Sequence, residues 1–173
     1  MLTNKAKYGL RAMCALTGSA EDWLQAHAIA ARANVPPKFL EAILVDLRKA
    51  ALVRSRRGQT GGHALARAAD AIMVGDVIRA IDGPLAPVRC ASITAYRPCH
   101  DCADPSRCAV RALMRETRQA LSGVLDHCSL ATLAQRAGQE TWMQSAIGDV
   151  PVGRISRRRN APDATRDAEP IST

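Results

Sequence analysis

The sequence predicts a mainly α-helical fold with one small β-hairpin, and three observations support this prediction. Aromatic residues make up only 3% of the 173 residues, so the core must be aliphatic, which favours helices over a β-sandwich. Apolar side chains recur at helical spacing in several segments. One glycine-rich stretch, residues 58–62, lies between two short segments that we expect to pair as strands.

The chain is strongly basic. Its net charge is +8 and its pI is near 9.7, which indicates a polyanionic partner, either nucleic acid or an anionic membrane face. No apolar run approaches the length that spans a bilayer, and the first residues lack the pattern of a signal peptide. We therefore expect a cytoplasmic protein with no membrane partner. In a reducing compartment, clustered cysteines are more often metal ligands or redox groups than disulfides.

The first predicted helix covers residues 3–17. Gly18 is a natural stop for this helix. Cys14 lies on the apolar stripe, so we interpret it as a small buried side chain rather than a ligand. The stripe, at helical spacing, consists of Ala6, Leu10, Met13, Cys14 and Thr17.

Two short helices joined by a tight turn follow, and together they form a helix-turn-helix. The first contains Ile29 and Ala33. Asn34 can adopt the left-handed conformation of the turn, and Pro37 suits the first position of the next helix. The expected buried stripe of this second helix is Leu40, Ile43, Leu44 and Leu47, and its outward face carries Lys38, Glu41, Ala42, Val45, Arg48 and Lys49.

A β-hairpin is predicted directly after the second helix. Val53 begins one strand, Ala64 and Leu65 belong to the return strand, and glycines mark the loop between them. Five basic residues and no acidic one fall between positions 48 and 57. Because this run joins the outward helix to the hairpin, we interpret it as a DNA contact rather than a solvated face. The basic residues are Arg48, Lys49, Arg54, Arg56 and Arg57, and the loop glycines are Gly58, Gly61 and Gly62.

The expected roles at a DNA duplex differ along this surface. The N-terminal side chains of a recognition helix meet base edges in the major groove, which places Lys38, Glu41 and Ala42 there. Glu41 can accept from the amino group of cytosine, and Ala42 can contact a thymine methyl group. The hairpin arginines are expected to hold phosphates. The full set of predicted DNA-binding residues is Lys38, Glu41, Ala42, Arg48, Arg54, Arg56, Arg57, Gly61, Gly62 and His63.

Two further helices and a short final helix complete the predicted fold. One spans residues 74–82 and stops at Gly83. The other covers residues 109–128 and carries a heptad seam about three repeats long, which predicts a homodimer. Ser129 can cap a short final helix, and the composition from about residue 148 predicts a disordered tail. The seam consists of Val110, Met114, Thr117, Leu121, Val124 and Cys128.

Together these elements predict a winged helix-turn-helix followed by a long dimerisation helix. The predicted organisation is a DNA-binding domain over residues 1–85, a cysteine-rich loop over 86–108, the long helix and final helix over 109–147, and the tail over 148–173.

Four cysteines lie within nineteen residues of the loop, at positions 90, 99, 102 and 108. Four thiolates satisfy the ligand count of a [2Fe–2S] or [4Fe–4S] cluster or of a Zn site, so Cys90, Cys99, Cys102 and Cys108 are the candidate metal ligands. A thiol/disulfide redox switch remains an alternative. Basic neighbours would favour thiolates and offset the charge of a cluster; these are Arg89, Arg97, Arg107 and Arg111.

Four stretches resemble, in order, the Rrf2 (Rrf-two) family of bacterial winged-helix transcriptional regulators. They read "LTNKAKYGLRAM", "FLEAILVDLRKAALVRSRRG", "GGHALAR" and "VGDVIRAIDGPL", and the resemblance covers about residues 1–135. It implies a homodimer that binds a palindromic DNA operator. It also implies three cysteines that hold an iron–sulfur cluster, with a fourth ligand that varies between members, and it favours Fe–S over Zn here.

The chain departs from that pattern at the fourth ligand. Cys102 and Cys108 match the second gap between the family's cysteines, and Cys90 occupies the first position. Some members have His where this chain has Arg111, and others have an acidic residue where it has Lys7 or Tyr8. His63 stands in the wing where an aromatic residue is common. Cys99 is an extra cysteine, so we expect it to be the fourth ligand.

The predicted function is a DNA-binding transcriptional regulator, expected to be a repressor, whose operator binding is modulated by the cluster. We find no catalytic Ser/His/Asp set and no phosphate-binding glycine loop, so we expect neither an enzyme nor a small-molecule substrate. The alternatives are the same DNA-binding dimer with a structural Zn site or a thiol switch, and a small Fe–S electron carrier. If the protein were an electron carrier, the basic helix-turn-helix would have no function.

Overall fold

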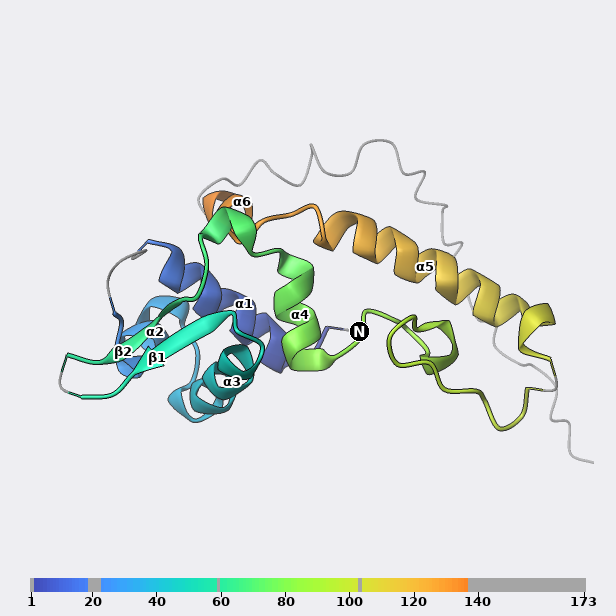
Figure 1. Ribbon diagram of the computed structural model, residues 1–173, viewed down its shortest axis with the longest axis horizontal. Coiled ribbons are helices and arrows are strands. Elements are labelled where there is room, and N and C mark those ends of the chain that lie inside the picture. Colours follow the sequence, from blue (N-terminus) through green and yellow to red (C-terminus); the bar gives the residue numbers. More distant parts are fainter. Residues whose placement is uncertain (1, 19–22, 59, 103, 137–173) are drawn as a thin grey trace, which may run out of the picture. The chain divides into compact units, whose positions relative to one another are not determined.

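A computed structural model describes residues 2–18, 23–58, 60–102 and 104–136. The predicted tail and the end of the 109–147 segment lie outside these residues. The elements, shown in Figure 1, are α1 (Asn4–Thr17), α2 (Ala26–Ala33), α3 (Pro37–Lys49), β1 (Val53–Arg56), β2 (Gly62–Leu65), α4 (Val74–Asp82), α5 (Ala109–Leu125) and α6 (Leu130–Arg136), with short 3₁₀ turns η1 (Ala69–Ala71), η2 (Arg89–Ala91) and η3 (Pro105–Arg107).

The helix-turn-helix forms as the local signals predict. Asn34 ends α2 with φ 49° and ψ 54°, the left-handed conformation of the turn, and Pro37 is the first residue of α3. Val35, between the helices, is only 4% exposed. The predicted apolar stripe of α3 is buried at all four positions. These features confirm the predicted mainly α fold with a helix-turn-helix.

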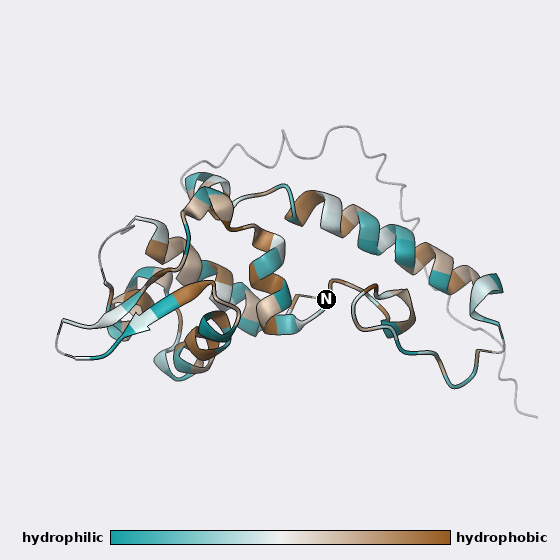
Figure 2. Cartoon of the chain, viewed as in Figure 1, coloured by the Kyte–Doolittle hydropathy of each residue, from teal (hydrophilic) through white to brown (hydrophobic). Residues whose placement is uncertain are grey.

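The core joins α1, α2, α3 and the hairpin. Its fully buried large side chains include Met13, Ile29 and Leu47. Figure 2 shows hydrophobic and hydrophilic residues interleaved along the helices, the pattern of helices that are apolar on one side. The stripe of α1 is centred differently from the prediction: Leu10, Cys14 and Thr17 are half-buried. The fully buried positions of α1 are Ala6, Gly9, Ala12, Met13 and Leu16.

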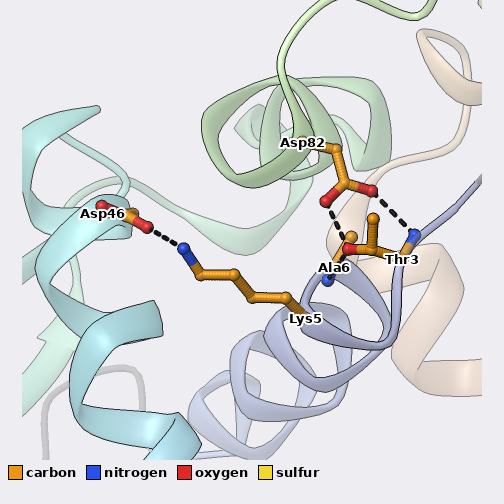
Figure 3. Close-up of polar contacts among 5 residues, drawn as sticks. All are labelled: Thr3, Lys5, Ala6, Asp46 and Asp82. Atoms are coloured by element: carbon orange, nitrogen blue, oxygen red, sulfur yellow. Dashed lines mark hydrogen bonds and ion pairs between the residues drawn. The ribbon is translucent and has the colours of Figure 1, made fainter.

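Two polar contacts fix the start of α1 to its neighbours (Figure 3). The Thr3 hydroxyl caps α1 by accepting from the backbone N–H of Ala6 at 3.1 Å. The backbone N–H and the hydroxyl of Thr3 both donate to the carboxylate of Asp82, the last residue of α4. Lys5 pairs with Asp46 of α3. The N-terminal turn of α1 is therefore tied to both α3 and α4.

The wing is an antiparallel hairpin with a third segment attached. Val53 pairs with Leu65 and Arg56 pairs with Gly62, as the predicted hairpin requires. Leu24, which precedes α2, forms a backbone bridge with His63 on the other edge of β2. A Cβ atom on Gly62 would lie 2.5 Å from the carbonyl oxygen of Leu24, so only glycine permits this close approach.

The long helix α5 exposes most of its apolar residues. None of its residues is buried, and Val110, Leu113, Leu121 and Val124 are 42–67% exposed. It ends at Leu125, so the predicted seam is too long at its C-terminal end: Cys128 lies beyond the helix. The carbonyl of Cys128 instead accepts from the N–H of Val74 at 2.9 Å.

The chain after α5 returns to the core of the first helices. Met73 and Ser129 form a backbone bridge, and the Ser129 hydroxyl caps α6 by accepting from the N–H of Thr132 at 3.1 Å, as predicted. Leu130 is fully buried in the same core as Met13. None of the described helices is long and apolar enough to cross a membrane.

Candidate nucleic-acid interface and thiol site

The outward face of α3 carries the predicted base-reading residues. Lys38, Glu41 and Ala42 are exposed in the first half of the helix, and Arg48 is exposed near its end. Phe39 is 45% exposed, with the Lys38 ammonium 5.2 Å from its ring centroid. The opposite face of α3 is buried in the core, so this face is exposed to solvent and accessible to DNA.

The wing arginines Arg54 and Arg56 are exposed, and contacts within the protein fix their side chains. Arg54 donates from Nε to the carbonyl of Leu65 at 3.1 Å, and Arg56 donates from Nη2 to the carbonyl of Thr60 at 2.6 Å. Both guanidinium groups also lie over the ring of Trp23, which comes from the segment before α2. Sequence reasoning missed Trp23, because its position in the chain gives no signal that it reaches the wing.

His63 and the two glycines before it shape the wing. The His63 ring is half-buried, and its Nδ1 lies 2.9 Å from the Ser55 hydroxyl. Loss of solvation lowers the pKa of His63, and the charge of Arg48 lowers it further. Gly61 is buried in the turn, and Gly62 admits the Leu24 backbone. These three residues lie beside the basic side chains and set the path of the hairpin.

The cysteine loop brings its four thiols together in two pairs. Cys90 is the largest influence that raises the pKa of Cys99, and Cys108 contributes to raising the pKa of Cys102. Cys90 and Cys102 also interact electrostatically across the two pairs. Cys90 is buried, whereas Cys99 is exposed. The structure therefore places Cys99 near Cys90, and Cys102 near Cys108, within the one loop.

In each pair the pKa of one thiol is raised. The hydrogen bond to Cys90 is the main cause that raises the pKa of Cys99, and partial burial raises the pKa of Cys102, with the thiol of Cys108 adding to the effect. Metal ligation by thiols releases protons. Binding of a metal group would therefore replace these S–H contacts with bonds from sulfur to the metal.

One arginine joins both ends of the loop. The Nε of Arg111 donates to the carbonyl of Cys90 at 2.9 Å, and its Nη1 donates to the carbonyl of Pro105 at 3.2 Å. Its backbone N–H lies 3.4 Å from the sulfur of Cys108, the residue that caps α5. The guanidinium also lies 5.7 Å from the ring centroid of Tyr96. Arg111 thus anchors the loop to the first turn of α5.

The donor set fits an all-thiolate metal site in its chemistry, since it supplies four soft sulfur ligands. The thiols are arranged as pairs rather than as a closed cage. Among the described residues, no group of three or more Cys, His, Asp or Glu side chains has the arrangement of a metal site. The same four sulfurs can chemically form disulfides within each pair.

Cys14 and Cys128 lie away from this loop. Both are half-buried, and burial raises the pKa of Cys14, with the neighbouring Cys128 as the second cause. Cys14 contacts the hydrophobic core from α1. Their surroundings agree with the predicted packing role, although Cys128 packs from the loop after α5 and not from a helical seam.

Comparison with known proteins places these features in one family. The family model Rrf2, described as an iron-dependent transcriptional regulator, matches residues 2–136. A relative from Rhodobacter capsulatus, described as an Rrf2-like HTH-type transcriptional regulator, is 40% identical over 134 residues, which cover 75% of this chain and 89% of the relative.

Two solved structures share the fold. CymR, the global cysteine regulator of B. subtilis, is 34% identical with a TM-score of 0.62, covering 78% of this chain and 96% of that chain. IscR of T. potens is 28% identical with a TM-score of 0.61, covering 79% of this chain and 88% of that chain. The resemblance in the sequence is thereby confirmed, and these relatives are regulators rather than enzymes. With its helix-turn-helix, its β-hairpin wing and a match from residue 2 to residue 136, the chain belongs to the Rrf2 family of DNA-binding transcriptional regulators.

Proposed function

We propose that this chain is a homodimeric regulator whose operator binding is modulated by an iron–sulfur cluster held by Cys90, Cys99, Cys102 and Cys108. The observation that carries the proposal is the placement of four cysteines in one loop directly before α5, where Cys99 lies near Cys90 and Cys102 lies near Cys108. The cysteine spacing alone does not require this proximity, because eight residues separate the first two thiols.

The surroundings of the thiols support this assignment. The Arg111 guanidinium donates to the carbonyl of Cys90, and the Arg111 backbone N–H lies at the sulfur of Cys108, so this residue holds two of the proposed ligands in place. The family's description as iron-dependent agrees with an iron-containing group. When bound, a cluster would supply a crosslink among the four thiolates that is sensitive to iron and oxidants. Cys99 is the proposed fourth ligand, in place of the His or acidic residue of relatives.

The proposed signal output passes through α5. The loop is anchored to the first turn of this helix through Arg111 and Cys108. The apolar side chains exposed along α5 would be covered by a second copy of the chain, as a heptad seam requires. A change in the loop would thereby alter how two DNA-binding units are spaced.

The proposed DNA contacts divide into reading and positioning. Lys38, Glu41 and Ala42 meet base edges, and Glu41 selects cytosine through its amino group. The arginines of the wing bind phosphates and fix the register of the protein on the duplex. The regulator is proposed to act as a repressor, because a dimer seated on an operator excludes other proteins from the same DNA.

The test is anaerobic reconstitution of six single Cys→Ala variants, with iron and acid-labile sulfide measured per monomer. We expect substitution at Cys90, Cys99, Cys102 or Cys108 to give a labile or absent cluster, because a missing thiolate must be replaced by water or a weaker donor. Cys14→Ala and Cys128→Ala are matched controls that should keep the wild-type visible spectrum. A Cys99→Ala protein with wild-type cluster content and lifetime would refute the four-thiolate site.

A thiol switch is the second candidate. It is favoured by the proximity of the thiols in two pairs, since among the described residues no three such donors are arranged for a metal. Oxidation by a peroxide would join Cys90 to Cys99 and Cys102 to Cys108, with loss of two hydrogens from each pair as water forms. The similar regulator CymR is named a global cysteine regulator, which agrees with a thiol-based signal.

The colour and metal content of the purified protein separate the candidates. A cluster absorbs visible light, whereas Zn and disulfides do not. Full occupancy by Zn, with no uptake of iron and sulfide under anaerobic conditions, would favour the structural Zn alternative. Loss of four free thiols on oxidation, with no bound metal beforehand, would favour the switch.

A further inference from the structure

Trp23 lies beneath two arginines of the wing. The Arg54 guanidinium carbon is 5.3 Å from the centroid of the indole ring, and that of Arg56 is 4.8 Å away. Both distances are within the range of a cation–π contact. Trp23 precedes α2 by three residues, so this contact joins the segment before the helix-turn-helix to the first strand of the wing.

The strand geometry explains why one ring serves both arginines. Side chains two residues apart on a strand project from the same face, about 7 Å from each other. Arg54 and Arg56 meet this condition on β1 and are exposed, whereas Val53 is buried in the core. A two-ring indole is broad enough to carry two guanidinium groups side by side.

The backbone holds Trp23 in this place. The next residue, Leu24, exchanges two hydrogen bonds with His63: its N–H donates to the His63 carbonyl at 3.0 Å, and the His63 N–H donates back at 2.8 Å. Gly62 permits the contact because any side chain there would collide with the Leu24 backbone. The ring is thus fixed to the wing on both sides, through β1 and through β2.

The two arginines keep most of their donors. Each guanidinium has five N–H groups, and each donates one of them to a wing carbonyl. Stacking on a ring uses the face of the guanidinium and leaves its edge available. The remaining N–H groups of Arg54 and Arg56 can therefore bind the oxygens of a phosphate.

We propose that Trp23 is a positioning residue of the DNA interface, a platform that holds Arg54 and Arg56 ready for the phosphates of the DNA backbone. The inference rests on the DNA binding of the family and is independent of the cysteines. Long arginine side chains lose conformational freedom on binding, and holding them beforehand removes that cost from association. Phosphate contacts do not depend on the base sequence, so the platform should strengthen binding to any DNA duplex.

The test is a double-mutant cycle between Trp23→Leu and Arg56→Ala in the full-length protein. Leucine keeps apolar bulk but removes the aromatic face. The probe is a labelled duplex of mixed sequence, at a salt concentration low enough for every variant to bind. We expect Trp23→Leu to weaken binding by roughly fivefold to tenfold, as expected for two side chains that must be ordered on binding. In the Arg56→Ala background, the loss of binding free energy caused by Trp23→Leu should be about half, or less, of the loss in the wild-type background.

Two controls separate positioning from a merely structural role. Arg57→Ala is the matched arginine, because the Trp23 ring contacts Arg54 and Arg56 but not Arg57 among the described residues. Trp23→Leu should keep its full effect in that background. Trp23→Phe retains an aromatic face and should recover most of the wild-type affinity, with circular dichroism showing unchanged helix content.

Three outcomes would overturn the inference. Trp23→Leu could bind as tightly as the wild type, or lose the same factor in the Arg56→Ala and Arg57→Ala backgrounds, or show no recovery with phenylalanine. A wild-type protein that binds no duplex at all would instead overturn DNA binding itself, and the platform with it.

Discussion

Arg111 is the residue on which the geometry of the cysteine loop depends most. Its guanidinium donates to the carbonyls of Cys90 and Pro105, which lie at opposite ends of the loop. Its backbone N–H donates to the sulfur of Cys108, the residue that caps α5. The sequence shows only that an arginine stands where some relatives have histidine. In the structure that arginine holds together the two ends of the loop that carries the four cysteines.

Replacing Arg111 with glutamine should loosen the loop without removing a thiol. We expect a loss of about 1–3 kcal/mol in the free energy of unfolding, since two hydrogen bonds from a charged donor are weakened. We also expect faster loss of a reconstituted cluster, measured by the decay of visible absorbance under air. Arg107→Gln is the control, because its side chain is exposed on the same loop. Equal cluster lifetimes in the two variants would contradict the anchoring role.

His63 should make the stability of the protein depend on pH. Burial and Arg48 lower its pKa in the folded state, so the unfolded chain binds the proton more readily than the folded chain does. Protonation therefore favours unfolding, and stability should fall as pH drops below the ordinary histidine pKa of about 6.5. Thermal melts from pH 8 to pH 5 should show a smaller decline for His63→Gln than for the wild type. The same decline in stability in His63→Gln and in the wild type would rule out His63 as a cause. His27→Gln, at an exposed site, is the control and should decline as the wild type does.

Sequence reasoning succeeded at residues whose signal is local. Asn34 and Pro37 are recognisable because a left-handed turn and a helix start each favour one residue type. Trp23 and Arg111 could not be found this way, because their roles come from residues 31 and 21 positions away in the chain. Gly75 is a similar case. Any side chain there would overlap the carboxylate of Asp126, and nothing within α4 predicts that neighbour.

Among the described elements, α5 exposes most of its large apolar side chains. Its heptad spacing predicts an apolar seam, and the structure leaves that seam exposed. The predicted end at residue 128 was wrong, since Asp126 caps the helix by donating from its N–H to the carbonyl of Ser122 at 2.9 Å. Periodicity alone could not detect this, because Cys128 happens to continue the pattern while belonging to the next segment.

A charge on the seam should separate the proposed dimer. Leu121→Glu would place carboxylates between two apolar helices, where burying an unpaired charge is costly. We expect monomers by sedimentation velocity and weaker operator binding. Gln119→Glu adds the same charge at an exposed position of the same helix and should remain dimeric. Sedimentation of Leu121→Glu as a dimer would show that the seam is not the interface.

At the scale of the whole molecule, a continuous set of contacts links the cysteine loop to the wing. The loop is anchored to the start of α5, and Asp126 at the end of α5 pairs with Arg79 of α4 at 2.6 Å. Arg79 lies 3.7 Å from Asp76, which in turn lies 3.9 Å from Arg67, just after β2. Such pairs are weak singly at the surface, but together they join the end of α5 to α4 and to the segment that follows β2.

DNA binding should separate into a reading part and a positioning part. Arg56→Ala should weaken binding to operator and mixed-sequence DNA about equally and reduce the salt dependence by about one counterion, as for a lost phosphate contact. Glu41→Ala should instead relax the preference at one base pair, by about 1–3 kcal/mol. Selection from a random duplex library measures both. Identical base preferences in wild type and Glu41→Ala would exclude the reading role.

The most direct test of the central claim is the operator affinity of one protein preparation with and without its cluster. The operator is the duplex that the wild-type protein selects from a random library. We predict that anaerobically reconstituted protein and the same protein stripped by a chelator differ at least about tenfold in Kd, and that Cys99→Ala stays at the stripped value whatever iron and sulfide are supplied. Equal affinities for the reconstituted and stripped protein, at measured full and zero cluster content, would contradict the account.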